Sequence, residues 1–124
     1  RTLSQNPAVR FVEGDFFAMA SSEWGFDPQV NCRKFDAILL DIDHSPYFHL
    51  APSHASFYSH QGLTKLKGHL RPNGVFALWS NDLPDRIFVE RLKSIFNYAE
   101  AVEINFHNPL QDCEVTQSVY LAKP

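Results

Sequence analysis

Two aspartates one residue apart follow a short apolar run in the stretch KFDAILLDIDHSP, residues 34–46. The run lacks the polar alternation of a half-exposed strand, which predicts a strand over 35–41 that is buried on both faces. Asp41 and Asp43 then follow the carboxyl end of that strand, where open α/β sheets place their chemistry. Carboxylates at such a position can take up a proton or hold a cationic group. Asp41 and Asp43 are therefore the candidate catalytic residues.

Histidines accompany these acids, at positions 44, 49 and 54. His44 follows Asp43 directly, and the imidazole of a histidine is a side chain that can act as a general base. A spacing of five residues matches neither a helix nor a strand, and no cysteine lies close by. The sequence therefore predicts no metal site.

The remaining pattern indicates how these residues are positioned. Apolar runs and alternation predict strands, and the spacing of Leu63, Leu66 and Leu70 predicts a helix. The expected strands cover 8–13, 35–41, 75–80, 99–106 and 115–122, and the expected helices cover 15–20, 60–70 and 86–96. This order predicts a three-layer α/β sandwich whose sheet is mostly parallel and ends in an antiparallel hairpin. The segment 42–57 is a long loop, and RPNG, 71–74, is a turn.

Composition limits the kinds of partner. The 124 residues suit one domain over 1–124, and a formal net charge of −3 argues against nucleic acid. No apolar run reaches the roughly 20 residues of a membrane helix. With no evident signal peptide, and with Cys32 and Cys113 expected to be free thiols, we expect a cytoplasmic protein.

Several segments, in this order, resemble a known family. VRFVEGDFF (9–17) resembles the third strand and Gly-Asp turn of class I, Rossmann-like S-adenosylmethionine-dependent transferases. KFDAILLDIDHSP resembles their fourth strand and catalytic acid, and residues 57–80 resemble the following helix, turn and fifth strand. Within that superfamily the chain is similar to the spermidine synthase group, the polyamine aminopropyltransferases. The resemblance covers only the second half of the family's fold.

The resemblance implies an activity and a donor. Alkyl transfer, of an aminopropyl or a methyl group, would run from decarboxylated S-adenosylmethionine or S-adenosylmethionine to a small-molecule amine. Asp15 would accept a hydrogen bond from the adenine amino group, and Phe16 would supply a backbone N–H or an apolar edge to the ring.

The resemblance also implies roles around the acceptor. Asp41 would take a proton from the amine, since a neutral amine is the nucleophile, and Asp43 would orient the acceptor. His44, Tyr47 and Tyr58 lie on segments that border the acceptor and are candidates for its binding.

The sequence departs from the family on both sides of the site. Ile42 replaces a serine, and Asp43 comes one residue before the family's second acid, so the acceptor is not evident. None of the glycines belongs to a G-x-G turn; they are Gly14, Gly25, Gly62, Gly68 and Gly74. The chain therefore resembles a fragment without the glycine-rich donor loop, which we expect to be inactive alone although its parent is an enzyme.

A missing half would leave strands 8–13 and 35–41 without neighbours on one edge. Exposed strand edges invite pairing, so we expect a homo-oligomer formed through these edges. Two alternatives remain open. One is a non-catalytic α/β module, derived from such a transferase, that binds a partner. The other is a response-regulator receiver domain, in which Asp41 is the phosphoacceptor.

Overall fold

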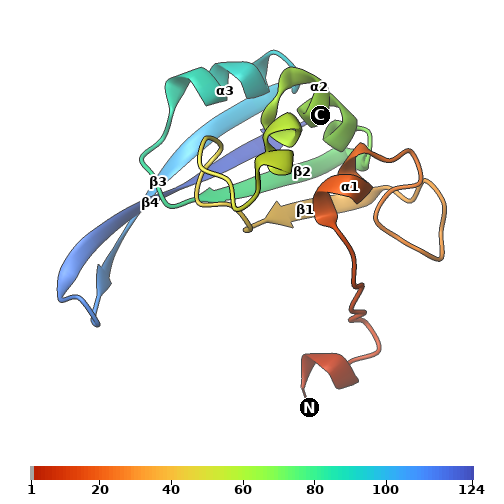
Figure 1. Ribbon diagram of the computed structural model, residues 1–124, viewed down its shortest axis with the longest axis horizontal. Coiled ribbons are helices and arrows are strands. Elements are labelled where there is room, and N and C mark those ends of the chain that lie inside the picture. The colour runs from red at the N-terminus through yellow and green to blue at the C-terminus, as the bar shows by residue number, and fades with distance from the viewer. Residues whose placement is uncertain (1) are drawn as a thin grey trace.

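Four strands and three α-helices form the body of the protein in the computed structural model, which describes residues 2–124 (Figure 1). The order is α1 (Phe16–Ser21), β1 (Phe35–Leu40), α2 (His60–Lys67), β2 (Leu70–Ser80), α3 (Arg86–Lys93), β3 (Tyr98–Asn108) and β4 (Cys113–Lys123). Two 3-10 helices, Leu3–Gln5 (η1) and Pro52–Tyr58 (η2), complete the described elements. The fold is α/β, as the sequence predicts.

The sheet has the strand order β1-β2-β4-β3. The pair β1 and β2 is parallel, with Leu40 opposite Leu78, and is joined by a crossover through α2. The other two pairs, β2 with β4 and β3 with β4, are antiparallel. The expected parallel neighbours and closing hairpin are therefore confirmed, but a mostly parallel sheet is wrong. Two of its three pairings are antiparallel because β4 folds back between β2 and β3. These antiparallel pairings do not fit the parallel sheet of a receiver domain.

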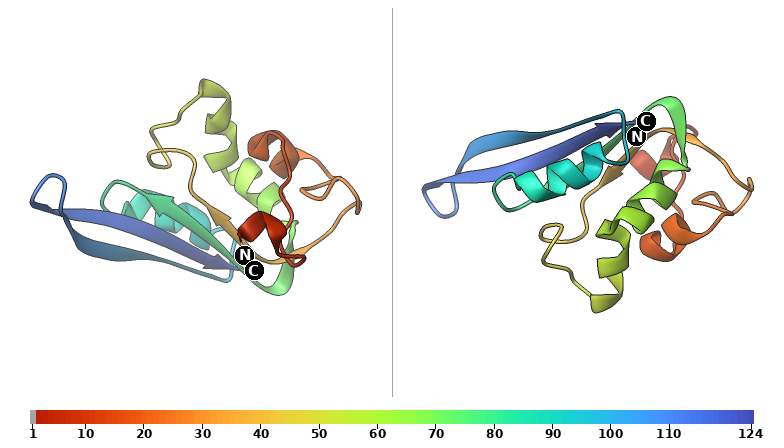
Figure 2. Two further views of the ribbon diagram at one scale, coloured as in Figure 1. Left: turned by 90° about the horizontal axis from the view of Figure 1, so that it is seen from below. Right: turned by 90° about the horizontal axis from the view of Figure 1, so that it is seen from above.

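Only one face of the sheet is covered by helices, so the expected third layer is absent from residues 2–124. In Figure 2 the strands lie in front of α3 when the molecule is seen from below, and α3 lies in front of the strands when it is seen from above. The crossover from β1 to β2 contains α2, and the crossover from β2 to β3 contains α3. Both run in the same direction across the sheet. Because such crossovers are right-handed, α2 and α3 lie on the same face. The core lies under them and includes Phe76, Leu78 and Tyr120, each at most 1% exposed.

The expected strand over 8–13 does not form. These residues run away from the body without a ladder partner, and Phe11 is 73% exposed (Figure 1). A β-strand needs a neighbouring strand to pair with its backbone N–H and C=O groups, and none of the described strands pairs with this segment. The apolar pattern of a strand is present, but the pairing that would make it one is not.

An ion pair anchors the segment at one point. Arg10 lies 2.7 Å from the Asp27 carboxylate, and its guanidinium also donates to Gln29 over 2.7 Å. Arg33 pairs with the other oxygen of Asp27, also at 2.7 Å. The Asp27 side chain is 1% exposed, and hydrogen bonds from Arg33 and Arg10 hold the pKa of its carboxyl far below the usual value. Residues 8–13 are thus tied to the 27–33 loop and not to the edge of β1.

Local side-chain hydrogen bonds set where the helices begin. Asp15 caps α1 by accepting from the N–H groups of Phe17 and Ala18, Ser59 caps α2, and Asp85 caps α3. Gly62 is required in the first turn of α2, because a Cβ there would lie 2.2 Å from the carbonyl oxygen of Ser56. The helices over 60–70 and 86–96 end earlier than predicted, at Lys67 and Lys93.

The strand β2 begins earlier than the predicted 75–80, because it takes in the expected turn. Leu70 is opposite Phe35 and Val75 is opposite Ala37, so residues 71–74 bulge out of the ladder. Gly74 in this bulge is buried beside the carbonyl oxygens of Arg71 and Phe35. RPNG therefore acts as a bulge inside a strand.

Two surface properties complete the fold. Cys32 and Cys113 are exposed and unpaired, as expected. None of the helices in the part of the chain that the structure describes has the length and apolar character to cross a bilayer.

Candidate functional site

The loops that follow β1 and β2 meet at the carboxyl edge of the sheet. The N–H of Asn81 donates to the carbonyl oxygen of His44 over 2.8 Å. The His44 imidazole lies 3.0 Å from the Asp82 carboxylate and 3.3 Å from the Asn81 amide. Because the two strands are parallel, their C-terminal loops emerge side by side, and these contacts lock them together.

Asp41 is the first residue after β1 and is exposed at this edge. Among residues 2–124, no group hydrogen-bonds or ion-pairs with its carboxylate. Its position at the strand end agrees with the sequence-based expectation. An ionised carboxylate with free oxygens can accept a proton or hold a cation from a ligand.

Asp43 has the opposite environment, because its side chain is fully buried. One oxygen accepts from the Leu50 N–H at 2.7 Å and contacts Nδ1 of His54 at 2.9 Å, and the other accepts from the Tyr58 hydroxyl at 2.8 Å. Burial alone would raise the pKa of this carboxyl, but the hydrogen bonds from His54, Leu50 and Tyr58 together hold it below the usual value. Both oxygens are thus engaged within the loop.

The acceptor-side candidates have different surroundings. His44 is exposed and pairs with Asp82, as described above. The Tyr47 hydroxyl donates to Asp85 over 2.5 Å, and burial together with that carboxylate raises its pKa to about 12. Tyr58 is 2% exposed and points to Asp43. His44 and Tyr47 therefore lie at the surface of the edge, and Tyr58 lies beneath it.

The donor-side candidates, Asp15 and Phe16, lie at the start of α1. Oδ1 of Asp15 is occupied by the helix cap, at 2.9 Å from the Phe17 nitrogen and 3.3 Å from that of Ala18. The Phe16 ring stacks on Phe26, with centroids 4.9 Å apart, and so faces the core. A pocket of about 260 Å³ includes Asp15, Phe17 and Lys65 in its lining. Asp41 does not line this pocket.

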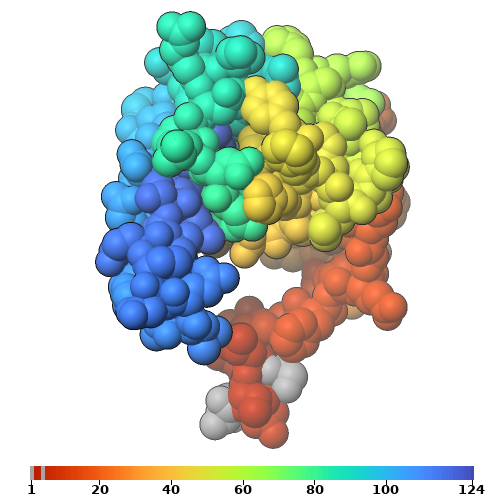
Figure 3. Space-filling model, turned by 60° about the vertical axis from the view of Figure 1, so that its left-hand side comes forward, coloured from red at the N-terminus to blue at the C-terminus, as the bar shows by residue number. Residues whose placement is uncertain are grey.

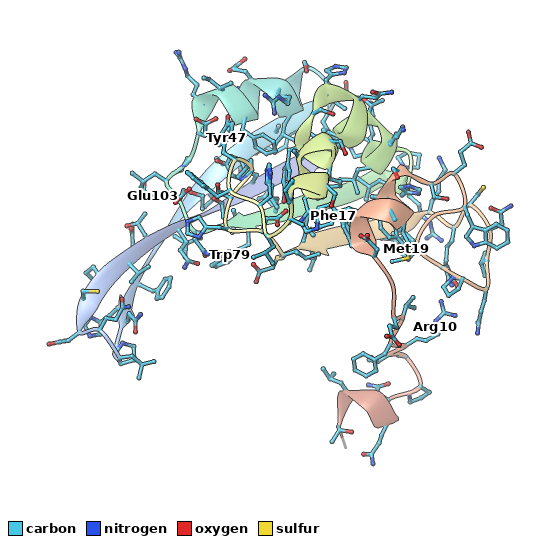
Figure 4. All side chains as sticks on the ribbon, viewed as in Figure 1. Arg10, Phe17, Met19, Tyr47, Trp79 and Glu103 are labelled. Carbon is cyan, nitrogen blue, oxygen red and sulfur yellow. The ribbon has the colours of Figure 1, made fainter. Side chains whose placement is uncertain are left out.

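One aromatic contact joins the two groups of candidates. The Phe17 ring, labelled in Figure 4, stacks on the His54 imidazole with centroids 3.8 Å apart. His54 in turn holds Asp43, which closes the loop after β1. The geometry of α1 is thereby linked to the loop that carries Asp41.

The sequence reasoning missed three polar residues at this edge: Asn81, Asp82 and Asp85. Their signal was available in the stretch NDLPD, 81–85, which follows a second strand parallel to the first. It also missed His54 as a partner of Asp43, a contact across 11 residues that no local pattern marks. Within the described residues, no cluster of three or more His, Cys, Asp or Glu side chains could hold a metal ion.

No protein-family model and no curated protein matches the chain. Among solved structures, the chain is similar to human methyltransferase-like protein 13, which was solved in complex with SAH. The TM-score is 0.57 with 22% sequence identity, over 89% of this chain and 46% of that chain. The fold is methyltransferase-like. The chain spans less than half of the length of this structural neighbour, so the likeness concerns one part of the neighbour's fold.

Proposed function

We propose that the protein transfers an alkyl group from an S-adenosylmethionine-type donor to an amine, as in the spermidine synthase-like branch of the superfamily. The observation that carries this proposal is the carboxylate of Asp41 at the carboxyl end of β1, which none of the described residues engages in a hydrogen bond or ion pair. The methyltransferase-like fold supports a donor of this type, because the structural neighbour was solved with SAH. The polyamine-type acceptor rests on the sequence resemblance alone.

Sulfonium donors are reactive, so the protein mainly has to align donor and acceptor for in-line displacement. The amine nitrogen attacks the carbon attached to sulfur, the new C–N bond forms, and the C–S bond breaks to leave a neutral thioether. An amine is protonated at neutral pH and must first lose that proton. Asp41 is the group proposed to take it, which contributes roughly 10²–10⁴-fold to the rate.

The surroundings of Asp41 suit a cationic acceptor. Asp82 and Asp85 lie on the adjoining loop, and their carboxylates add negative charge to the same edge. Negative potential raises the local concentration of an ammonium group and steers it to the site. His44 and Tyr47, held by these two acids, are proposed to contact the acceptor.

Asp43 is proposed as a positioning residue. Its carboxylate faces the interior of the loop and meets donors from Leu50, His54 and Tyr58. Through these contacts it fixes the path of the chain just after Asp41. Tyr58 belongs to the same internal support.

The donor is proposed to lie toward Asp15. Its second oxygen remains available to the adenine amino group, since the helix cap uses only Oδ1. Phe16 contributes its backbone, because its ring packs among aromatic core residues. The chain of residues 1–124 lacks a glycine-rich turn, so we propose that transfer needs further polypeptide and that this chain alone is inactive.

Calorimetric titration of the protein that the complete gene encodes tests this function. Methyl transfer leaves S-adenosylhomocysteine and aminopropyl transfer leaves methylthioadenosine, so the tighter of these two ligands identifies the transferred group. The variant Asp15→Asn keeps the helix cap, because asparagine caps as well as aspartate, but loses the negative charge. We expect it to bind the nucleoside more weakly. No binding of either ligand would reject the proposal in favour of a non-catalytic partner-binding module.

A further inference from the structure

The loops that follow β1 and β2 expose large apolar side chains at the edge where Asp41 lies. Tyr47 and Phe48 on the first loop are 47% and 65% exposed, and Leu83 on the second loop is 63% exposed. Figure 3 shows the two loops side by side, the first in yellow and the second in blue-green, and a backbone hydrogen bond joins them. Exposed apolar side chains that gather on one surface mark a place where another molecule binds. We call Tyr47, Phe48 and Leu83 the apolar rim.

Contacts within the two loops hold the apolar rim in place. The Tyr47 hydroxyl donates to Asp85, which lies on the second loop. The Phe48 ring meets the His44 ring edge to face, with centroids 6.0 Å apart. The N–H groups of Tyr47 and Phe48 both donate to the hydroxyl of Ser45, which is buried. The rim is therefore part of a fixed loop and is formed before any ligand arrives.

The same edge offers one carboxylate that is free to hold an ammonium group. Four acids lie in these loops, and three of them are already engaged by the chain. Asp43 has three partners within its loop, Asp82 contacts an imidazole, and Asp85 accepts from the Tyr47 hydroxyl and from the first turn of α3. In the described part of the chain, Asp41 is the one member of the four without a hydrogen-bond or ion-pair partner. One unengaged carboxylate suits one ammonium group.

The apolar rim distinguishes two kinds of amine. A diamine or polyamine carries a second ammonium group a few carbon atoms from the first. With the reacting nitrogen at Asp41, this second charge would meet the rim, and taking a charge out of water without a partner is costly. An alkyl or aryl group in the same place gains free energy by leaving water. The rim therefore favours an amine whose remaining part is apolar.

We propose that the acceptor is a small monoamine with an apolar body, an alkyl chain or an aromatic ring, and is not a polyamine. Asp41 holds its amino group, and its body lies against Tyr47, Phe48 and Leu83. This inference rests on the proposed transfer and names the substrate class of the same site. It departs from the spermidine synthase group, whose resemblance implies that Asp43 orients the acceptor, because the side chain of Asp43 is fully buried.

Two amines that differ at one end test the proposal. Pentylamine and putrescine have the same number of non-hydrogen atoms, but one ends in a methyl group and the other in a second ammonium group. The protein that the complete gene encodes is supplied with labelled S-adenosylmethionine or its decarboxylated form, and kcat/KM is measured for each amine. We expect kcat/KM for pentylamine to exceed that for putrescine by about tenfold or more. Phenylethylamine should be at least as good an acceptor as pentylamine, because its ring buries a large apolar area.

A negative charge in the apolar rim should shift this preference. Phe48→Asp removes an apolar contact and supplies a partner for a second ammonium group, so the ratio of kcat/KM for pentylamine to that for putrescine should fall by about tenfold or more. Leu83→Asp is an independent variant on the second loop, also at an exposed side chain, and should act in the same direction. Leu110→Asp is the control. It adds the same charge at a 95% exposed leucine between β3 and β4 and should leave the ratio unchanged.

The possible failures differ from one another. A kcat/KM for putrescine equal to or above that for pentylamine would overturn the inference and leave the proposed transfer intact. Equal effects of Phe48→Asp, Leu83→Asp and Leu110→Asp on the ratio would also overturn it, because the rim would then make no contact with the acceptor. Transfer to none of the amines would reject the proposed function itself, and the inference with it.

Discussion

Tyr58 donates a 2.8 Å hydrogen bond to the buried carboxylate of Asp43, 15 residues earlier in the chain. The contact closes the long segment between β1 and α2 into a folded loop, together with the bonds from Leu50 and His54. The same loop begins with Asp41, whose carboxylate has no hydrogen-bond or ion-pair partner in the described part of the chain. Two acids one residue apart thus have separate tasks, one internal and one facing solvent.

Tyr58→Phe should destabilise the protein by about 1–3 kcal/mol, because it leaves one oxygen of a buried carboxylate without a donor. Phenylalanine retains the ring and its packing, so the loss in free energy of unfolding measures the contribution of the hydroxyl group. Urea unfolding followed by circular dichroism measures it. Tyr98→Phe, at a 44% exposed tyrosine, is the matched control and should change stability by less than about 0.5 kcal/mol. Equal losses of stability in the two variants would contradict a stabilising role of the hydrogen bond between Tyr58 and Asp43.

Asp27→Asn should lower the urea midpoint at pH 7, since two arginines then lose their shared carboxylate. The pKa of Asp27 is lowered in the folded state, so its contribution to stability is complete above the unfolded pKa of about 3.9. This contribution is lost as the pH falls through the folded pKa. Wild type should therefore lose more stability than the variant between pH 5 and pH 2. Parallel stability curves in that range would show that the ion pairs contribute nothing.

Gly62→Ala should destabilise the protein by about 1–3 kcal/mol or more, although alanine is the better helix former. Its Cβ would lie 2.2 Å from the Ser56 carbonyl oxygen and 2.5 Å from that of Phe57, which are backbone atoms that cannot move aside easily. Gly14→Ala is the control, because its Cβ would meet only the flexible end of Met19. Thermal unfolding of both variants compares them. A Gly62→Ala protein as stable as wild type would contradict the close packing of α2 on η2.

The chain of residues 1–124, prepared alone, should self-associate. No described strand pairs with the outer edge of β1, and the sheet face opposite the helices exposes Leu39. Sedimentation velocity at several concentrations measures this. Leu39→Lys places a charge on that face of the sheet, beside the outer edge of β1, and should shift the equilibrium toward monomer. Asp36→Lys keeps a charge at an already exposed position of the same strand and should shift it much less. A monomeric wild-type chain at high concentration would contradict this prediction.

The strands β1, β2, β3 and β4 were predictable because their apolar runs and alternation are local signals. The cap of α1 at Asp15 was predictable for the same reason. Residues 8–13 carry an equally clear pattern, yet a strand also needs a neighbour, and the pattern does not say whether one exists. One face of the sheet is uncovered because both crossovers run in the same direction. Local apolar periodicity predicts the elements but not the direction of the crossovers between them.

The sequence predicts where the site lies, but it does not predict the different environments of Asp41 and Asp43. The end of an apolar run marks Asp41 and Asp43 equally, so the sequence could not separate an exposed acid from a buried one. The separation depends on Leu50, His54 and Tyr58, which reach Asp43 only after the loop has folded. Asp82 and Asp85 join the edge because β2 lies parallel to β1, which is a relation between distant segments.

The most direct test of the central claim compares Asp41→Asn with Asp36→Asn in the protein that the complete gene encodes. The two acids lie at opposite ends of β1, and Asp36 is exposed and paired with Arg71. With labelled S-adenosylmethionine or its decarboxylated form as donor and a panel of amines as acceptors, Asp41→Asn should reduce turnover by roughly 10²–10⁴-fold. Binding of S-adenosylhomocysteine or methylthioadenosine should remain nearly unchanged, and Asp36→Asn should behave as wild type. Undiminished turnover in the Asp41→Asn protein would contradict the account.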